Sequence, residues 1–390
     1  MMIAIEKPSQ QPNQQTEINQ PVDQNTVRRR GTGLRAYNPT KAFKGYTLFT
    51  PLTGQGEIYL IDIEGNLVHE WKLPYAPGLY AYFLPNGNLF YNGKIVENPP
   101  RFPAWQNFKG GVVTEIEPSG KIVWEYQHPD HHHDARRLKN GNTIILAIEK
   151  VPAELVPKIQ GGVPNSEVNG TDIYSDVLYE VTPTGEIVWT WHAHEHLDPE
   201  TDIITKQDSR HEWSHGNTVG ELADGNIIVS FRNISTVAII DRQTSEIIWR
   251  LGADVLAHQH YPHELENGNI LIFDNGTHRQ NVALPYSRVI EVNRATKEIV
   301  WQYHDKPAQN FFSPYISGAQ RLPNGNTLIT EGNFGRFFEV TSDGEIVWEY
   351  INPYFARRNS GDIPPLAQGE NNAVFRAFRY AAKEIPWLKK

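Results

Sequence analysis

The chain contains no cysteine and no long apolar run. The absence of cysteine excludes disulfide bonds, thiolate metal ligands and cysteine nucleophiles. An apolar run of about 18 residues, which a membrane-spanning helix needs, is absent, so we expect no membrane insertion. The N-terminal segment also lacks the apolar stretch of about 7–15 residues found in signal peptides, so we expect a cytoplasmic protein. Lack of cysteine is equally compatible with export, which therefore stays open.

An excess of positive charge is also missing. The chain has 36 Lys and Arg against 45 Asp and Glu, a formal net charge of −9. Without a basic stripe there is little counterion release to gain, so we expect no nucleic-acid partner. An anionic small molecule is not excluded, because one arginine and a few imidazoles can set a local potential. The 390 residues include ten Trp, seventeen Tyr and sixteen Phe, enough for one large all-β domain or two or three ordinary ones.

Residues 1 to about 35 have the composition of a disordered tail. Gln, Asn and Pro dominate this segment, and it holds few large apolar residues. Such a segment cannot bury enough surface to offset the entropy lost on ordering. We therefore expect a disordered tail over residues 1–35 and one folded domain over residues 36–385.

Two short patterns recur along the rest of the chain. The first is a polar turn followed by an apolar strand, in PNGNLFY (85–91), NGNTIILA (140–147), DGNIIVSF (224–231), NGNILIFD (267–274) and NGNTLITE (324–331). The second occurs six times, in EGNLVHEW (64–71), SGKIVWEY (119–126), TGEIVWTW (184–191), TSEIIWRL (244–251), TKEIVWQY (296–303) and DGEIVWEY (343–350). Asn-Gly and Asp-Gly supply the positive-φ residues of tight turns, so each unit is predicted to be two hairpins.

Six such units predict an all-β fold, a six-bladed β-propeller with four-stranded blades. A four-stranded sheet with apolar faces is unstable alone, whereas blades arranged in a ring bury those faces against their neighbours. A sandwich or a solenoid explains the hairpins but not six units with a displaced first copy. GYTLFTP (45–51) stands where the sixth copy of the first pattern should be. We expect NNAVFRAFRY (371–380) to supply the missing inner strand, so that N- and C-terminal strands close the ring.

Alignment on the turn glycines predicts which side chains face the central channel. Eight residues before the glycine, at the start of each inner strand, stand Leu79, His133, Asn217, His260 and Ser317. Two residues earlier, with the same parity, stand Pro77, His131, His215, His258 and Tyr315. Seven residues after the glycine the second strand returns to this level, where two units carry Arg232 and Asn275.

Three of these side chains, His215, Asn217 and Arg232, are expected to meet at one mouth of the channel. His133 and His260 approach from the two flanking blades. A single histidine is more often structural than catalytic, but three at equivalent positions with an arginine and an asparagine indicate a site. Other histidines are assigned elsewhere: His132 and His263 to packing or the surface by parity, and His192, His194 and His196 to loops. His128, His131 and His258 stay undecided.

This set of residue types suits a tetrahedral oxyanion. Arginine offers a two-pronged donor with fixed charge, and asparagine and histidine offer further donors. Histidine can also act as nucleophile or proton carrier near neutral pH. Metal binding competes, since three histidines can hold Zn²⁺, but an arginine at the same point repels a dication. No metal and no cofactor are therefore expected. Asp274 is read either as a partner that orients an imidazole or as a turn acceptor.

Four stretches resemble the bacterial arylsulfate sulfotransferases, which are six-bladed propellers: HHDARRLKNGN, HGNTVGELADGNIIVSFRN, QHYPHELENGNILIFDNG and NAVFRAFRY. The resemblance covers roughly residues 40–380 and implies transfer of a sulfuryl group from a phenolic sulfate ester to a phenol without a nucleotide sulfate donor. It implies that His260 is the nucleophile that becomes sulfated in a ping-pong reaction. It further implies that His215, Asn217 and Arg232 hold the sulfate.

In the same family pattern, His133 matches the imidazole of a His-Asp pair, and Ser317 stands where an extra donor fits. The partners implied are a small aryl sulfate and a phenol, and a homo-oligomer stays open. Periplasmic members of the family carry an export signal and an N-terminal β-sandwich domain, which this sequence does not show. Two other classes stay open: a non-catalytic binding or scaffolding propeller, and a metal- or quinone-dependent propeller enzyme. Hydrolysis, with water as acceptor, is a variant of the first reading.

Overall fold

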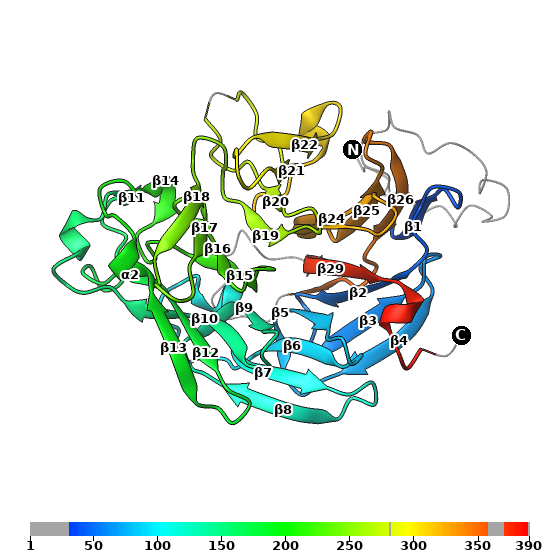
Figure 1. Cartoon of the computed structure of the whole chain (residues 1–390), viewed down its shortest axis with the longest axis horizontal. Coiled ribbons are helices and arrows are strands. Elements are labelled where there is room, and N and C mark those ends of the chain that lie inside the picture. The colour runs from blue at the N-terminus through cyan, green and yellow to red at the C-terminus, as the bar shows by residue number, and fades with distance from the viewer. Residues whose placement is uncertain (1–30, 281, 358–369, 389–390) are drawn as a thin grey trace, which may run out of the picture.

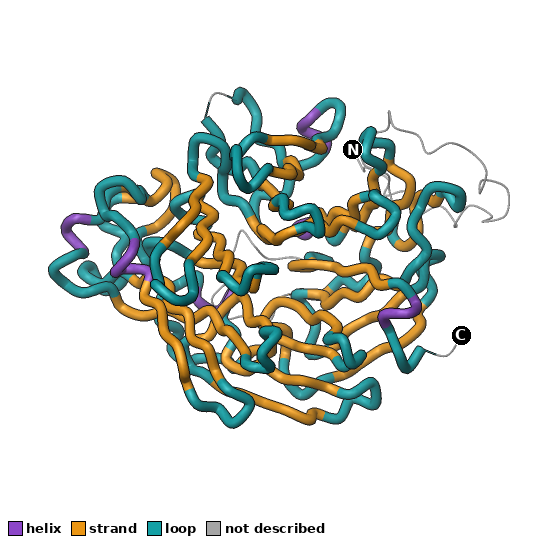
Figure 2. Tube along the Cα trace, viewed as in Figure 1, coloured by secondary structure: helices purple, strands orange, loops and turns teal. Residues whose placement is uncertain are grey.

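A computed structural model describes residues 31–280, 282–357 and 370–388 of the chain. The fold is the predicted six-bladed β-propeller with four-stranded blades (Figure 1). Strand and loop account for nearly all of the described chain (Figure 2). Within the described residues, helix is confined to single turns: α1 (Trp105–Phe108), α2 (Ala193–His196) and four 3₁₀ turns at Val156–Lys158, Ala308–Asn310, Gly332–Phe334 and Ala382–Glu384. In the described residues no helix has the length and apolar character that a membrane crossing requires.

The blades follow one another along the chain, each running from the channel outward. Blade 1 is β29 (Val374–Tyr380), β2 (Tyr46–Pro51), β3 (Glu57–Ile61) and β4 (Leu67–Lys72). Blade 2 is β5 (Ala76–Phe83), β6 (Leu89–Lys94), β7 (Gly111–Ile116) and β8 (Ile122–Gln127). Blade 3 is β9 (His131–Arg137), β10 (Thr143–Lys150), β12 (Tyr174–Val181) and β13 (Ile187–His192).

The second half of the ring repeats the arrangement. Blade 4 is β15 (Gly216–Glu221), β16 (Ile227–Phe231), β17 (Thr236–Ile240) and β18 (Ile247–Leu251). Blade 5 is β19 (His260–Glu264), β20 (Ile270–Asp274), β21 (Arg288–Val292) and β22 (Ile299–Tyr303). Blade 6 is β23 (Gly318–Arg321), β24 (Thr327–Glu331), β25 (Arg336–Val340) and β26 (Ile346–Ile351). Two small pairs lie outside the blades: β11 (Gly161–Val163) with β14 (Ile204–Ser209), and β27 (Ala356–Arg357) with β28 (Glu370–Asn371).

A strand from the C-terminal part of the chain closes the ring. β29 pairs antiparallel with β2 from Tyr46↔Tyr380 to Pro51↔Val374 and so forms the inner strand of blade 1. At the other end of the chain, β1 (Gly33–Tyr37) adds a fifth strand to the outer edge of blade 6 by pairing with β26.

Part of the expected tail is therefore strand. The tail was expected to reach residue 35, but Gly33, Leu34 and Arg35 belong to β1. Leu34 and Tyr37 pack against the cluster between blades 6 and 1, which gives this polar segment an apolar anchor. Residues 1–30 lie outside the described residues.

The tryptophan of the second repeat explains how neighbouring blades hold together. In five blades an indole N–H, and in blade 1 an imidazole, contacts a backbone carbonyl in the outer turn of the next blade. The six contacts are His69 Nε2 with Pro118 O (3.0 Å), Trp124 Nε1 with Pro183 O (2.9 Å), Trp191 Nε1 with Ser245 O (2.9 Å), Trp249 Nε1 with Arg294 O (2.8 Å), Trp301 Nε1 with Ser342 O (2.8 Å) and Trp348 Nε1 with Ile63 O (2.7 Å). They form a closed circle of bonds around the ring.

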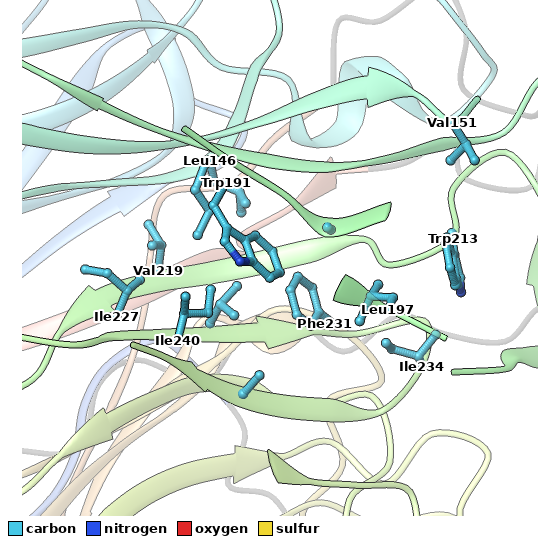
Figure 3. Packing of buried hydrophobic residues seen from close by; sticks show 14 of the residues in the cluster. Leu146, Val151, Trp191, Leu197, Trp213, Val219, Ile227, Phe231, Ile234 and Ile240 are labelled. Atoms are coloured by element: carbon cyan, nitrogen blue, oxygen red, sulfur yellow. The ribbon is translucent and has the colours of Figure 1, made fainter. Parts of the chain in front are cut away.

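Apolar packing between blades accompanies these bonds. Between blades 3 and 4, Trp191 and Phe231 stack with ring centroids 6.1 Å apart, and Leu146, Val219 and Ile240 surround them (Figure 3). All five side chains are essentially inaccessible to solvent. Burial of this kind stabilises a fold by about 25 cal/mol per Å² of apolar surface, so the blade interfaces are the main apolar contribution to the fold.

The Asn-Gly-Asn turns have a second role besides reversing the chain. Both asparagine amides donate to one glutamate on the third strand of the same blade. The four sets are Asn86 and Asn88 with Glu115, Asn140 and Asn142 with Glu180, Asn267 and Asn269 with Glu291, and Asn324 and Asn326 with Glu339. Blade 4 has Asp224 in the turn and Ile239 in place of the glutamate, and Asp224 pairs with Arg294 of the next blade instead.

We expect the ion pair between Arg379 on β29 and Glu339 on β25 to stabilise the closed ring. Both side chains are fully buried, and Arg379 Nη1 donates to Glu339 Oε2 at 2.6 Å. Arg379→Met should lower the free energy of unfolding in urea by roughly 3–5 kcal/mol, because it leaves a buried carboxylate without its cation. Adding Glu339→Gln should restore part of the loss, and Lys383→Met, on the exposed end of the chain, should have little effect. Equal losses in the single and double variants would contradict this account.

Candidate active site

The inner strands are irregular where their side chains reach the channel. The register shifts between β9 and β10, between β15 and β16, and between β19 and β20, each time beside a predicted site residue. His133 and His215 have positive φ values of 48° and 51°. Bulges re-aim side chains, and strained backbone of this kind is found at functional sites. The inner strands β9, β15, β19 and β29 surround the centre of the ring (Figure 1).

Two of the predicted imidazoles touch each other. The ring centroids of His133 and His215 lie 4.8 Å apart in an edge-to-face arrangement. Phe108 of α1 contacts both rings at 4.7 Å, stacked on His133 and edge-on to His215. Phe108 belongs to the long connection between β6 and β7, which lies outside the repeats, so the sequence patterns gave no reason to select it.

His132 was assigned to packing or the surface, and the structure adds a direct contact with His133 that the parity argument did not foresee. Its ring is buried, and its Nδ1 lies 2.7 Å from Nδ1 of His133. Its Nε2 lies 3.2 Å from Oδ1 of the buried Asp176. The parity argument failed because the five residues of β9 from His131 to Ala135 stand opposite only three residues of β10, from Ala147 to Ile145.

The hydrogen bonds of His260 fix which ring nitrogen is free. Asn275 donates its amide Nδ2 to the carbonyls of Ser313 (2.8 Å) and Ile316 (2.9 Å), so both N–H groups are used. Its Oδ1 is therefore the acceptor that faces His260 Nδ1 at 2.8 Å. The carbonyl of His258, 3.1 Å from the same nitrogen, is a second acceptor. Nδ1 must carry the hydrogen, and the lone pair of the neutral ring is on Nε2.

Arg232 is bonded to His215 through the backbone, and its charge acts on the ring of His260. Its backbone N–H donates to the carbonyl of His215 at 3.1 Å, and its Nη1 donates to Asn233 Oδ1 at 2.9 Å. Asp208 is a weaker partner, with 3.5 Å between Oδ1 and Nη1. The side chain of Arg232 is 18% exposed, and its Nη2 has no partner among the hydrogen bonds of the described residues.

The other two predicted residues are held by the protein itself. Asn217 donates Nδ2 to Gln259 O at 2.9 Å, and its Oδ1 accepts the Thr218 hydroxyl at 3.0 Å, so one amide N–H is left for a ligand. Ser317 differs from the expectation that it offers a donor. Its hydroxyl donates to Ser313 Oγ at 2.9 Å and accepts the Gly332 N–H at 3.0 Å, which commits its hydrogen to the scaffold.

A second guanidinium, which sequence reasoning did not assign to the site, comes from the closing strand. Arg376 of β29 donates Nη2 to Asn217 O (2.8 Å) and Thr218 Oγ1 (2.6 Å), and Nη1 to Asp134 Oδ2 (3.1 Å). Its neighbour Phe375 approaches His260 edge-on at 6.1 Å. The sequence pointed to this strand only through the closing motif NAVFRAFRY. Arg376 itself could not be assigned, because β29 has no turn glycine by which to align it with the other inner strands.

Buried carboxylates contact the imidazoles, although the sequence predicted no carboxylate in the cluster. Glu212 is buried, its Oε2 lies 2.7 Å from Nδ1 of His215, and its Oε1 has no hydrogen-bond partner. Burial raises the pKa of Glu212 to about 8. Burial, with the charge of Arg232 as the next cause, lowers the pKa of His215 to about 3. The proton shared by this pair therefore belongs to the carboxyl group at neutral pH.

The remaining imidazoles of the cluster are held neutral. Burial and then the charges of His215 and His132 lower the pKa of His133 well below its usual value. Burial also lowers the pKa of His260 well below the usual value, against the hydrogen bond that its Nδ1 donates to Asn275, with Arg232 as a further cause of the lowering. A neutral His260 is the form that can act as a nucleophile.

Other candidate residues have structural roles. Asp274 accepts from Ala257 N (2.9 Å) and Arg288 Nε (2.8 Å), which supports the turn-acceptor reading over the one that orients an imidazole. His131 is buried and accepts the Gly111 N–H at 3.0 Å. His258 Nε2 lies 2.6 Å from Asp208 Oδ2, beside Arg232.

Comparison with known proteins gives one family. A model of the arylsulfotransferase (ASST) family matches residues 105–353, which is more than half of the chain and includes His133, His215, Arg232 and His260. No curated protein matches the chain.

Among solved structures, a protein of unknown function from Bacteroides caccae is 14% identical, with a TM-score of 0.53 over 86% of this chain and 98% of its own. A catalytically inactive virginiamycin B lyase from Staphylococcus aureus, solved with quinupristin, is 13% identical, with a TM-score of 0.44 over 84% of this chain and 90% of its own. At such an identity the likeness to the Bacteroides caccae protein shows the fold alone. The family match covers the blades that build the site, and the chain belongs to the arylsulfotransferase (ASST) family.

Proposed function

We propose that the protein moves a sulfuryl group from a phenolic sulfate ester to a phenolic acceptor through a sulfohistidine on His260. The observation that carries the proposal is the bond of His260 Nδ1 to Asn275 Oδ1, which leaves the lone pair of the neutral ring on Nε2. The charge of Arg232 acts on the same ring. Membership of the arylsulfotransferase family supports the same reaction. A binding or scaffolding propeller has no need of a buried neutral imidazole with one fixed free nitrogen.

In the first half-reaction, Nε2 of His260 bonds to sulfur while the bond from sulfur to the aryl oxygen breaks. The electron pair of the broken bond leaves with the phenolate. Arg232 and the remaining N–H of Asn217 donate to the sulfuryl oxygens, and these bonds strengthen as charge builds up in the transition state. His133 lies beside His215 and extends the same set of donors.

The departing phenolate needs a proton, because its conjugate acid has a pKa of about 10 by analogy with tyrosine. His215 gives the proton from Nε2 while its Nδ1 takes the proton of Glu212, so the carboxyl group is the source and the ring is the carrier. In the second half-reaction the acceptor phenol returns its proton by the same route. Its oxygen attacks sulfur, and Nε2 of His260 leaves with its electron pair. Atoms and charge balance over the cycle, and Glu212 ends protonated.

The direct test is release of 4-nitrophenolate from 4-nitrophenyl sulfate with and without phenol, in the presence of a chelator. We expect release that depends on phenol and survives the chelator. Release that depends on added metal or on a coloured cofactor would favour a metal- or quinone-dependent enzyme. Release without phenol dependence would indicate hydrolysis, and no release across a broad panel of aryl sulfates would favour a binding propeller.

Two variants test the site in the same assay. His260→Asn should abolish turnover, since it removes the only proposed nucleophile. Arg232→Lys should keep a trace of activity, because an ammonium group preserves the charge but not the two-pronged donor geometry. Full activity of the His260 variant would remove the assignment.

We expect the need for Glu212 to depend on the leaving group. Glu212→Gln keeps a hydrogen bond to His215 but cannot release a proton. It should slow transfer from phenyl sulfate by roughly 10²–10⁴-fold, the usual contribution of general acid catalysis, and slow transfer from 4-nitrophenyl sulfate far less. Comparison of single-turnover rates for the two donors measures this difference. Glu154→Gln, on an exposed loop, is the matched control. An equal loss with both donors would mean that Glu212 has only a structural role.

The same pair predicts a pH dependence. Because burial raises the pKa of Glu212 to about 8, the carboxyl group holds its proton below that pH and loses it above. The donor half-reaction with phenyl sulfate should therefore slow as pH rises through about 8, and this limb should vanish in Glu212→Gln. A wild-type profile that stays flat across this range would contradict the assignment of Glu212 as the proton source.

A further inference from the structure

A second cluster of ligating groups lies on the outer side of blade 3, where α2 marks its position (Figure 1). Glu149 is near the end of β10, His192 ends β13, and His194 is in α2. Glu149 Oε1 lies 2.7 Å from Nδ1 of His192 and 3.1 Å from Nδ1 of His194. The three ligand atoms all lie within 4.8 Å of one another.

This donor set matches a three-ligand zinc site. Two imidazoles and one carboxylate bind Zn²⁺ in known proteins, with a water molecule in the fourth tetrahedral position. The side chains of His194, Glu149 and His192 are 14%, 24% and 33% exposed, so an ion can enter and keep a water ligand. Lys150, the nearest lysine in the sequence, is engaged elsewhere, with its Nζ 2.7 Å from Asp172.

A rival cluster at the mouth of the channel suits a cation less well. Asp208, His258 and His278 also bring their ligand atoms within 4.8 Å of one another. The guanidinium of Arg232 lies 3.5 Å from Asp208 Oδ1, however, and its fixed positive charge opposes a dication there. Among the ion pairs of the described residues, no arginine or lysine is paired with Glu149, the carboxylate of the cluster on blade 3.

We propose that Glu149, His192 and His194 bind one divalent transition-metal ion of the zinc type. The site stands where two long connections leave blade 3: residues 151–173 follow β10, and residues 197–203 follow α2. These connections meet again in the parallel pair of β11 and β14, beyond which the chain continues to Glu212 and His215. The ion would thus fix the base of the segment that carries Glu212 into the channel.

The test is metal binding by the purified full-length chain after chelator treatment and dialysis. We expect one equivalent of Zn²⁺, and with Co²⁺ the visible absorption of a four-coordinate site. His192→Gln, His194→Gln and Glu149→Gln should each weaken binding by at least about 10-fold, because each removes one of only three protein ligands. Zn²⁺ should raise the Tm of the wild type, since it binds the folded chain, and should not raise that of the variants.

Two matched controls locate the ion. His196→Gln alters the same helix but leaves the three ligands in place, and His278→Gln removes one ligand from the rival cluster. Both should bind Zn²⁺ as the wild type does. Failure to bind Zn²⁺ or Co²⁺ stoichiometrically would overturn the proposal. So would binding that His278→Gln abolishes and His194→Gln does not. None of these measurements depends on sulfuryl transfer, so the proposal stands or falls independently of the proposed function.

Discussion

Closure of the ring by β29 is the constraint on which the rest of the structure depends. The strand completes blade 1, so no inner edge is left open, and the circle of indole and imidazole contacts runs unbroken from blade 6 to blade 1. The same strand carries Arg376 across the channel to the backbone of Asn217 in blade 4 and to Asp134 in blade 3. Closure of the ring and the arrangement of the site therefore depend on the same strand, because β29 completes blade 1 and also bonds to segments of blades 3 and 4.

In the proposed reaction, fixed positive charge and neutral imidazoles have different tasks. Burial keeps His133, His215 and His260 neutral, so the fixed positive charge comes from the guanidinium groups of Arg232 and Arg376. A neutral ring is a better nucleophile than a charged one, and a guanidinium keeps its charge at every relevant pH. The two residue types differ in pKa, so in the proposed site arginine supplies the charge and histidine supplies lone pairs and mobile protons. A site built from histidine alone would have to sacrifice one property for the other.

The architecture was predictable because it repeats. Asn-Gly turns and the Ile-Val-Trp pattern recur along the chain, so a unit with a weak pattern can be recognised from the others. Alignment on the glycines selected His133 and His215, whose rings touch in the structure. Residues outside the repeats could not be selected by alignment. Phe108 is such a residue, because it lies in the long connection between β6 and β7. The prediction of side-chain direction from alternation along the strand failed at His132, because side chains alternate between the two faces only in a regular strand and β9 has a bulge.

The bulges that defeated the parity argument are also what makes the site possible. A regular inner strand sends alternate side chains into the channel, with neighbours in sequence on opposite faces. On β9 the bulge lets adjacent residues His132 and His133 approach each other at 2.7 Å, and the positive φ of His133 holds this arrangement. Such backbone is unfavourable by roughly 1–3 kcal/mol per residue and persists only where its surroundings enforce it. The packed ring supplies that enforcement, so rigid blades are a condition for a dense cluster of imidazoles at their centre.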